Sequence, residues 1–468
     1  MNSTLWLPVT TPFLIATLLV FVPKEKIALH RRATVMTFIA LLVLATATIS
    51  DATFWQQAHT QPEPLSPLFF NHYALRLKIT PAGTNLCICL LFFLVTLVSG
   101  HPFHSRNKVK PFSISVLFIY GLMQVCFMAE DILVSIFFAT TTHFFFWILM
   151  TQMGTGRRSL IALRIFSIFL VIDSFAIGFY LAPKSVINFI PYPWAIALGT
   201  LLMSWLRLGV FPFHSIHRWA TQSIGPSVAL LFSICQFLIG VRFIPTEFFE
   251  LEPTLPVRES FYLLVIFHIF WIGFLSIGEK RPMMILTHGL LILSGLSLIL
   301  TPHAQETFTL QGPWPWMMGL LATFGLFTDE IHNLKNDTLA PFEHAQVGLL
   351  LRWKNLHFFT QALINAFAIC LIIFPFWLMW MPHNNYFSAS QRFLITPQLL
   401  FTILGAFCFS ILSLYGALFQ LWKRFNTAAP VERIIVPHGA ETPILWQWHA
   451  IGLWSSVLLV FGFSLLHF

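Results

Sequence analysis

The chain has 468 residues, of which 57% are hydrophobic and only 9% are charged, and its mean hydropathy is +0.77. Soluble globular proteins carry about 25% charged residues, so this composition excludes a soluble enzyme or binding module and indicates a polytopic membrane protein. The formal net charge of +8 is not arranged as a basic run with interleaved aromatic residues, and nucleic acid is therefore not an expected partner.

Apolar runs near the length that crosses about 30 Å of hydrocarbon follow one another along the chain. They predict fourteen transmembrane helices, over residues 4–22, 33–49, 85–99, 111–128, 132–151, 160–182, 194–219, 226–244, 260–277, 283–300, 314–327, 357–381, 394–422 and 445–467. The first run lacks a basic segment and a small-residue cleavage site, so we expect a retained helix rather than a removed signal. The fold class is therefore all-α, with a single transmembrane domain over 1–468.

Lysine and arginine are concentrated in alternate loops, as they are in the cytoplasmic loops of membrane proteins. The odd-numbered loops hold basic residues within 24–32, 106–110, 157–158, 280–281, 335–354 and 423–433, and the even-numbered loops hold acidic residues within 130–131, 247–259 and at 306. The alternation is kept across all fourteen runs. It predicts a multi-pass protein of a bacterial inner membrane, with both termini on the non-cytoplasmic side.

No cofactor or metal site is expected. The six cysteines all lie inside apolar runs, where they are typical small helix residues: Cys87, Cys89, Cys126, Cys235, Cys370 and Cys408. No histidine spacing completes a metal site. There is no nucleotide fingerprint, no cysteine cluster for iron–sulfur ligation and no histidine pair placed for haem. The chain therefore carries no evident catalytic or redox residues of its own.

The run at 194–219 is interrupted by Arg207, Gly209 and Pro212, and a polar turn with His214 follows. A broken helix at membrane depth is tolerated where it lines a protein-enclosed or watery cavity. Arg207 either extends to the membrane interface or faces such a cavity, and we favour the cavity because Gly209 and Pro212 would open carbonyls toward it. An arginine does not release a proton at physiological pH, so it would bias an ion path electrostatically rather than relay protons.

Other polar residues lie within the apolar runs. His143 either titrates as part of a functional site or is a hydrogen-bonded packing residue. For His268, interhelical hydrogen bonding and proton relay are equally supported alternatives. Gln236 is more typical of helix–helix hydrogen bonding, whereas His288 is close enough to a helix end to reach the headgroups. The threonines at 140–142 are expected to bond to their own helix. We expect no buried carboxylate, which argues against an ordinary proton pump.

Several motifs resemble the antiporter-like membrane subunits of respiratory complex I, a family shared with multi-subunit cation/proton antiporters, and the M-type subunit above all. Arg207-Leu-Gly-Val-Phe-Pro212-Phe-His214 has the spacing of the family's Lys-x-x-x-x-Pro-x-His. Residues 225–231 resemble the start of the following helix in the family. Glu279-Lys280-Arg281, followed by Thr287-His288-Gly289, resembles its Asp-x-Lys-Arg and Ser-His-x-Gly.

The resemblance implies two inverted five-helix repeats, here about 111–244 and 260–422, each with a broken helix. This chain departs from that pattern: Ala139 stands at the helix-five glutamate, Arg207 at the helix-seven lysine and Gln236 at or next to the helix-eight lysine. The second broken helix has no counterpart. The resemblance therefore implies a degenerate or altered proton path, with the candidate members Arg207, His143, His268, Gln236, His214, His288 and Lys280.

Three functions stay open from the sequence. The first is an antiporter-like subunit of a complex I-like NADH–quinone oxidoreductase or related ion-translocating assembly, in which the chain is at most a non-catalytic subunit of the enzyme. The second is the membrane subunit of an inorganic-carbon (bicarbonate or CO2) uptake complex with a zinc-containing cytoplasmic partner. The third is a non-conducting docking subunit. In each case we expect other membrane subunits, a cytoplasmic subunit and the lipid bilayer as partners.

Overall fold

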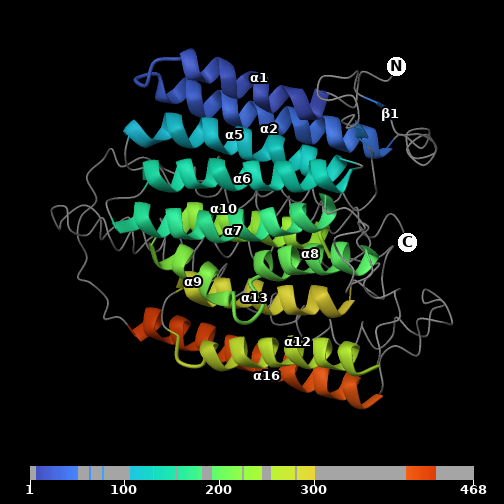
Figure 1. Cartoon of the computed structure of the whole chain (residues 1–468). Coiled ribbons are helices and arrows are strands. Elements are labelled where there is room, and N and C mark those ends of the chain that lie inside the picture. The colour runs from blue at the N-terminus through green and yellow to red at the C-terminus, as the bar shows by residue number, and fades with distance from the viewer. Residues whose placement is uncertain are drawn as a thin grey trace. The chain divides into compact units, whose positions relative to one another are not determined.

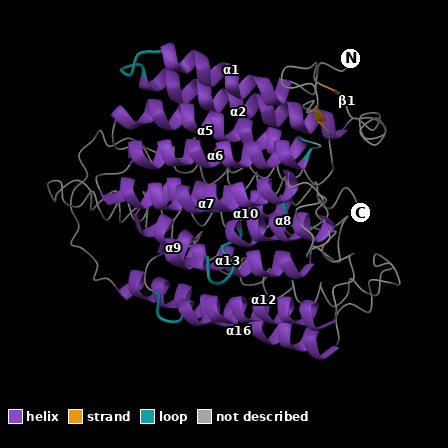
Figure 2. Cartoon of the chain, in the orientation of Figure 1, coloured by secondary structure: helices purple, strands orange, loops and turns teal. Residues whose placement is uncertain are grey.

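The structure is a computed structural model that describes residues 7–50, 63–64, 76–77, 106–129, 131–153, 157–181, 192–223, 226–244, 255–279, 282–300 and 397–427. These ranges are almost entirely helical (Figures 1 and 2). The helices are α1 (Leu7–Phe21), α2 (Ile27–Ser50), α5 (Arg106–Met128), α6 (Ile132–Met153), α7 (Arg157–Leu181), α8 (Tyr192–Arg207), α9 (His214–Ser223), α10 (Pro226–Arg242), α12 (Leu255–Ser276), α13 (Pro282–Leu300) and α16 (Pro397–Thr427). Two short antiparallel strands, β1 (Glu63–Pro64) and β2 (Arg76–Leu77), pair Glu63 with Leu77 and Pro64 with Arg76.

Contacts between residues divide the chain into two compact units. The first unit contains α1 to α10, and the second contains α13, α16 and α12 from Pro256 onward. In the first unit α1 and α2 pack on α5, and α5, α6, α7 and α8 follow as successive neighbours (Figure 1). Helix α10 packs against α5, α6, α8 and α9. Every side chain from Leu231 to Val241 on α10 is buried, so α10 forms the interior of this unit.

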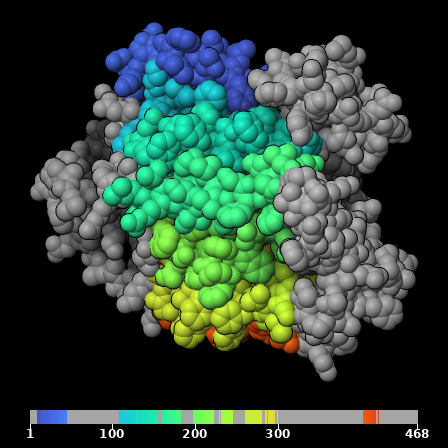
Figure 3. All heavy atoms as spheres, viewed as in Figure 1, coloured from blue at the N-terminus to red at the C-terminus, as the bar shows by residue number. Residues whose placement is uncertain are grey.

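The helices of the first unit carry large apolar side chains on their outer surface. Among the residues that the structure describes, four helices are long and apolar enough to cross a membrane, over Ile27–Leu44, Lys108–Met128, Ile132–Gln152 and Leu160–Leu181. Exposed side chains include Phe21 at 80%, Met36 at 65% and Phe137 at 61%, and residues of α5 to α7 occupy much of the face seen in Figure 3. Exposed apolar surface of this extent is typical of contact with lipid. The chain is therefore a multi-pass membrane protein.

Ten of the predicted runs coincide with described helices, the run at 194–219 being split between α8 and α9. Helix α2 begins six residues before the predicted 33, since the helix continues past the apolar run through the basic residues Arg31 and Arg32. His30 at this end donates from Nε2 to the carbonyl of Pro23 at 3.2 Å. The predicted runs at 85–99, 314–327, 357–381 and 445–467 lie outside the described residues. The fourteen-helix count and the inverted repeats stay predictions.

Lys110 joins the start of α5 to the end of α1. Its ammonium donates to the carbonyls of Val20 and Val22, both at 2.7 Å. The last carbonyls of a helix have no partner within the helix and carry the negative end of its dipole. A lysine there satisfies these groups and neutralises their partial charge. The contact also places the end of α1 and the start of α5 at the same end of the unit. These two helix ends border the first and third predicted loops, which both carry basic residues.

Helices α8 and α10 approach most closely at Gly240. A Cβ atom at this position would lie 2.7 Å from Cγ of Leu208, and the hydroxyl of Ser204 on α8 donates to the carbonyl of Gly240 at 2.8 Å. Small residues at helix crossings allow backbones in membrane proteins to approach one another. Because Gly240 has no side chain, the end of α8 can pack directly against the backbone of α10.

Gly240→Ala is expected to destabilise the first unit by about 1–3 kcal/mol, because the added methyl group overpacks Leu208. The matched control is Gly178→Ala on α7, where nothing lies within 4 Å of the added Cβ atom. There the gain in helix propensity, up to about 1 kcal/mol, is expected instead. The measurement is the free energy of unfolding in mixed micelles. Equal stability of the two variants would contradict the close crossing.

Candidate functional site

The centre of the first unit holds a buried ion pair between neighbouring helices. The guanidinium of Arg207, at the end of α8, donates from Nη2 to Oδ1 of Asp173 on α7 at 2.6 Å, and the two side chains are 0% and 1% exposed. Nη1 of Arg207 donates to the carbonyl of Met203 at 3.2 Å. The rings of Phe169 and Phe243 lie 5.7 and 5.6 Å from the guanidinium carbon, within the range of cation–π attraction.

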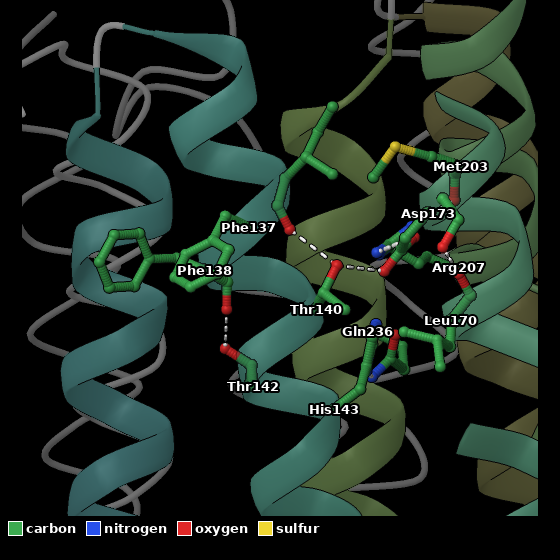
Figure 4. A network of polar contacts seen from close by, with 12 residues as sticks. Phe137, Phe138, Thr140, Thr142, His143, Leu170, Asp173, Met203, Arg207 and Gln236 are labelled. Atoms are coloured by element: carbon green, nitrogen blue, oxygen red, sulfur yellow. Dashed lines mark hydrogen bonds and ion pairs between the residues drawn. The ribbon is translucent and has the colours of Figure 1, made fainter. Parts of the chain in front are cut away.

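Thr140 links this ion pair to α6 (Figure 4). Its hydroxyl oxygen lies 2.7 Å from Oδ2 of Asp173 and 2.9 Å from the carbonyl oxygen of Ile136. Each carboxylate oxygen of Asp173 therefore has its own hydrogen-bond donor, one from α8 and one from α6. Three successive helices of the first unit meet at this one carboxylate.

The predicted break is confirmed, because α8 ends at Arg207 and α9 begins at His214. The chain turns at Gly209, whose φ of 64° lies in the left-handed region that glycine adopts without strain. The expectation that carbonyls near Gly209 and Pro212 open toward a cavity stays a prediction. The carbonyl of Arg207 accepts from Nε2 of His217 at 2.9 Å, and that of Phe211 accepts from Nε1 of Trp205 at 2.9 Å. Side chains of α8 and α9 thus supply hydrogen-bond donors to these two carbonyls at the break.

His143 and Gln236 form a second buried group beside the ion pair. Nε2 of Gln236 on α10 donates to Nδ1 of His143 on α6 at 3.0 Å, and both side chains are buried. The imidazole of His143 stacks on the ring of Phe169 with 4.2 Å between centroids. Since Arg207 lies over the same ring, one phenylalanine touches both polar groups. The structure therefore brings His143, Gln236 and Arg207 together, as the proposed path requires.

The other sequence-predicted residues lie elsewhere. His214 is half-buried on α9, where its ring stacks on Phe211 with 5.8 Å between centroids. In the second unit His268 donates from Nε2 on α12 to the carbonyl of Leu291 on α13 at 2.9 Å. His288 is fully buried and lies 3.2 Å from the hydroxyl of Ser276, so the headgroup position is wrong for it. Lys280 lies outside the described residues.

In the second unit a serine hydroxyl joins α16 to α12. Ser410 on α16 donates to the carbonyl of Ile269 on α12 at 2.7 Å and is also 2.8 Å from the carbonyl of Ala406. A Cβ atom on Gly273 would meet the backbone of Ser410 at 2.6 Å. The hydrogen bonds of His268 to Leu291 and of Ser410 to Ile269 thus both join helices within this unit.

Asp173 is the residue of this buried site that the sequence did not lead us to expect. The expectation that no carboxylate is buried is wrong. The signal was present, because an aspartate in the middle of the apolar run 160–182 is costly unless it has a partner inside the protein. Arg207 is fully buried, which excludes its extension to the interface, and the expected cavity beside it stays a prediction. The resemblance places an acidic residue at Ala139 on α6, whereas the acid that reaches Arg207 belongs to α7.

Comparisons with protein-family models and with curated proteins give no match. Among solved structures, the chain is similar to a chain of respiratory complex I from Thermus thermophilus with bound aureothin, at 16% identity and TM-score 0.65, over 99% of this chain and 97% of that chain. A chain of the membrane-bound sulfane sulfur reductase, an archaeal respiratory membrane complex, has 12% identity and TM-score 0.64, with 98% and 94% covered. A chain of the Mrp complex from Dietzia sp. DQ12-45-1b has 12% identity and TM-score 0.58, with 100% and 96% covered.

The protein therefore has the fold of the antiporter-like membrane subunits found in complex I-type and Mrp-type complexes. The resemblance read from the motifs is confirmed at the level of the fold. The structural match extends over nearly the whole chain, whereas the motifs are clearest in its middle. At these identities the function of the site has to be argued from its own residues.

Asp173→Asn is expected to destabilise the first unit by about 3–5 kcal/mol, because it leaves the charge of Arg207 buried without a counter-ion. The double variant Asp173→Leu with Arg207→Met removes both charges and is expected to be more stable than Asp173→Asn. A double-mutant cycle of Asp173→Leu, Arg207→Met and the double variant, read on the free energy of unfolding, measures the coupling. Additive single effects would show that the two side chains do not interact.

Proposed function

We propose that the chain is an antiporter-like membrane subunit of a multi-subunit ion-translocating complex, with an altered proton path in its first unit. The observation that carries this proposal is the buried Arg207–Asp173 ion pair at the helix break. Charged side chains within membrane helices are expensive and mark ion pathways, relays or sensors. A pair serving packing alone could be replaced by apolar residues with no loss of stability.

The surroundings of the pair supply further members of the path. Among the described residues, Nε2 of His143, Oε1 of Gln236 and Nε of Arg207 are buried polar atoms without a hydrogen-bond partner. Buried polar atoms are nearly always bonded to protein or to ordered water. These atoms therefore favour a water-mediated path from the helix break toward His143. His214, on the half-exposed start of α9, is placed to connect this path with the surface.

The proposal extends to the whole chain. It includes fourteen transmembrane helices in one domain, inverted repeats over about 111–244 and 260–422, and both termini on the non-cytoplasmic side. The end-to-end structural match supports the architecture, and the Lys110 contact at the end of α1 supports the loop alternation. In the second repeat His268, His288 and Lys280 are the candidate path members.

The complex I-like assembly is the favoured partner system, because chains of respiratory complexes are among the similar structures. The other membrane subunits and a cytoplasmic subunit of that assembly are the proposed partners. A non-conducting docking subunit is the second candidate, and Ala139 and Gln236 favour it because neither carries an ionisable group. The inorganic-carbon uptake complex is the third.

Purification of the chain from its native membrane in mild detergent separates these assemblies. Flavin-containing and iron–sulfur subunits in the purified complex are the expected result. A single large zinc-binding cytoplasmic partner would instead establish the inorganic-carbon assembly and overturn the favoured one. Proton-flux measurements on the same complex, reconstituted into vesicles, distinguish conduction from docking.

Replacing His143 by Asn together with His268 by Gln is expected to abolish proton flux into those vesicles. The two amides keep a hydrogen-bonding group in place but do not titrate near neutral pH. The matched control is His30→Gln, a buried histidine outside the site whose Nε2 donates to a carbonyl. Flux that is unchanged in the double variant would rule out the histidine relay.

A further inference from the structure

We propose that Asp173 is the residue that takes up and releases the proton at this site, and that Thr140 enables both states by turning its hydroxyl hydrogen between two acceptors. This inference rests on the proposed function and names the proton-binding group within it. It concerns a carboxylate on α7 and a threonine on α6, neither of which belongs to the path predicted from the sequence.

The argument starts from the single hydroxyl hydrogen of Thr140, which has two acceptors within reach. Oδ2 of Asp173 lies at 2.7 Å and the carbonyl oxygen of Ile136 at 2.9 Å. One hydrogen serves one of these acceptors at a time in a strong bond. When Asp173 is ionised, the bond to the carboxylate is charge-assisted and is therefore the stronger one.

Protonation of Asp173 reverses this arrangement. A proton taken up at Oδ2 makes the carboxyl group a donor, and the hydroxyl oxygen of Thr140 is the acceptor 2.7 Å away. The hydroxyl hydrogen of Thr140 then turns to the carbonyl of Ile136. One proton is gained and no covalent bond of the protein breaks. The hydroxyl hydrogen of Thr140 has an acceptor in both states, and the carboxyl hydrogen of protonated Asp173 has the hydroxyl oxygen of Thr140 as its acceptor.

The neighbouring threonines show that this arrangement is particular to Thr140. Thr141 and Thr142 donate to the carbonyls of Phe137 and Phe138, each at 2.8 Å, and have no second acceptor among the contacts of the described residues. Figure 4 shows Thr140 directed toward Asp173 and Thr142 directed to its own helix. Position 140 thus combines the ordinary bond of a helical threonine with a bond to the adjacent helix.

Arg207 keeps its charge throughout, because a guanidinium does not release a proton at physiological pH. The site is neutral when Asp173 is ionised and carries one positive charge when it is protonated. In the charged state Arg207 retains the carbonyl of Met203 and the rings of Phe169 and Phe243. Electron-rich faces and a carbonyl oxygen stabilise a buried cation, so the structure holds the arginine in both states.

The helices packed against α7 bring few other ionisable groups to this site. They are His143 from α6, Arg207 from α8, and His214, His217 and Arg218 from α9. His143 lies one turn along α6 from Thr140 and stacks on Phe169 of α7, so it is the titratable side chain that α6 contributes near this site.

The test is infrared difference spectroscopy on the purified complex between high and low pH. The carbonyl stretching band of a protonated carboxyl group is expected in the wild type and in Asp131→Asn, and it is expected to disappear in Asp173→Asn. Asp131 is a matched control, because it accepts from the backbone nitrogen of Leu133 at the start of α6 and asparagine keeps that cap. A band that survives in Asp173→Asn would overturn the proposal.

Thr140→Val tests the hydroxyl, with Thr140→Ser and Thr141→Val as controls. The loss of a hydrogen bond to a charged group predicts a fall of about tenfold or more in proton flux in Thr140→Val, together with a shifted carbonyl band. Thr140→Ser keeps a hydroxyl and is expected to restore both, while Thr141→Val is expected to leave both unchanged. An unshifted band in Thr140→Val would overturn the role of Thr140, since a purely structural threonine has no effect on that band.

The two proposals fail separately. A titrating Asp173 band in a complex without proton flux would sustain this inference and overturn the proposed function. Proton flux in a complex without an Asp173 band would overturn this inference and sustain the proposed function.

Discussion

The first unit is organised around one constraint, which is that burying the charge of Arg207 without a counter-ion costs several kcal/mol. Asp173 supplies that counter-ion from α7 at 2.6 Å, and this fixes the end of α8 against α7. Thr140 extends the same contact to α6, and His217 on α9 holds the carbonyl at which α8 stops. The crossing at Gly240 sets α10 against the last turn of α8. The helix break is therefore a packed and hydrogen-bonded structure whose position depends on the ion pair.

The proposed path combines a fixed charge with a titratable one. Arg207 cannot give up its proton, so it contributes a constant electrostatic bias. In the proposed path Asp173 and His143 change charge, and Arg207, the partner of Asp173, lies over the Phe169 ring on which His143 stacks. The resemblance to complex I subunits implies an acid on the helix of Ala139 and a lysine at the break. In this chain an arginine stands at the break and is paired with an acid from α7, so the break has a buried carboxylate although Ala139 does not supply one.

The sequence predicted the helices of the described part well, because apolar length is set by the thickness of the bilayer. It also predicted the break, since Gly209 and Pro212 interrupt a helix whatever surrounds them. Asp173 was missed because one carboxylate hardly alters the mean hydropathy of a run of more than twenty residues. The pairing of Asp173 with Arg207 depends on how two helices are rotated against each other, which no local pattern specifies. For the same reason Thr140 could not be told apart from Thr141 and Thr142, although only Thr140 faces α7.

Proton flux through the native complex, reconstituted into vesicles, tests the central claim most directly when wild type, Asp173→Asn and Asp131→Asn are compared at equal protein incorporation. If the ion pair at the break is the proton-binding centre, flux is lost in Asp173→Asn and kept in Asp131→Asn. Flux at the wild-type level in a correctly assembled Asp173→Asn complex would contradict the account.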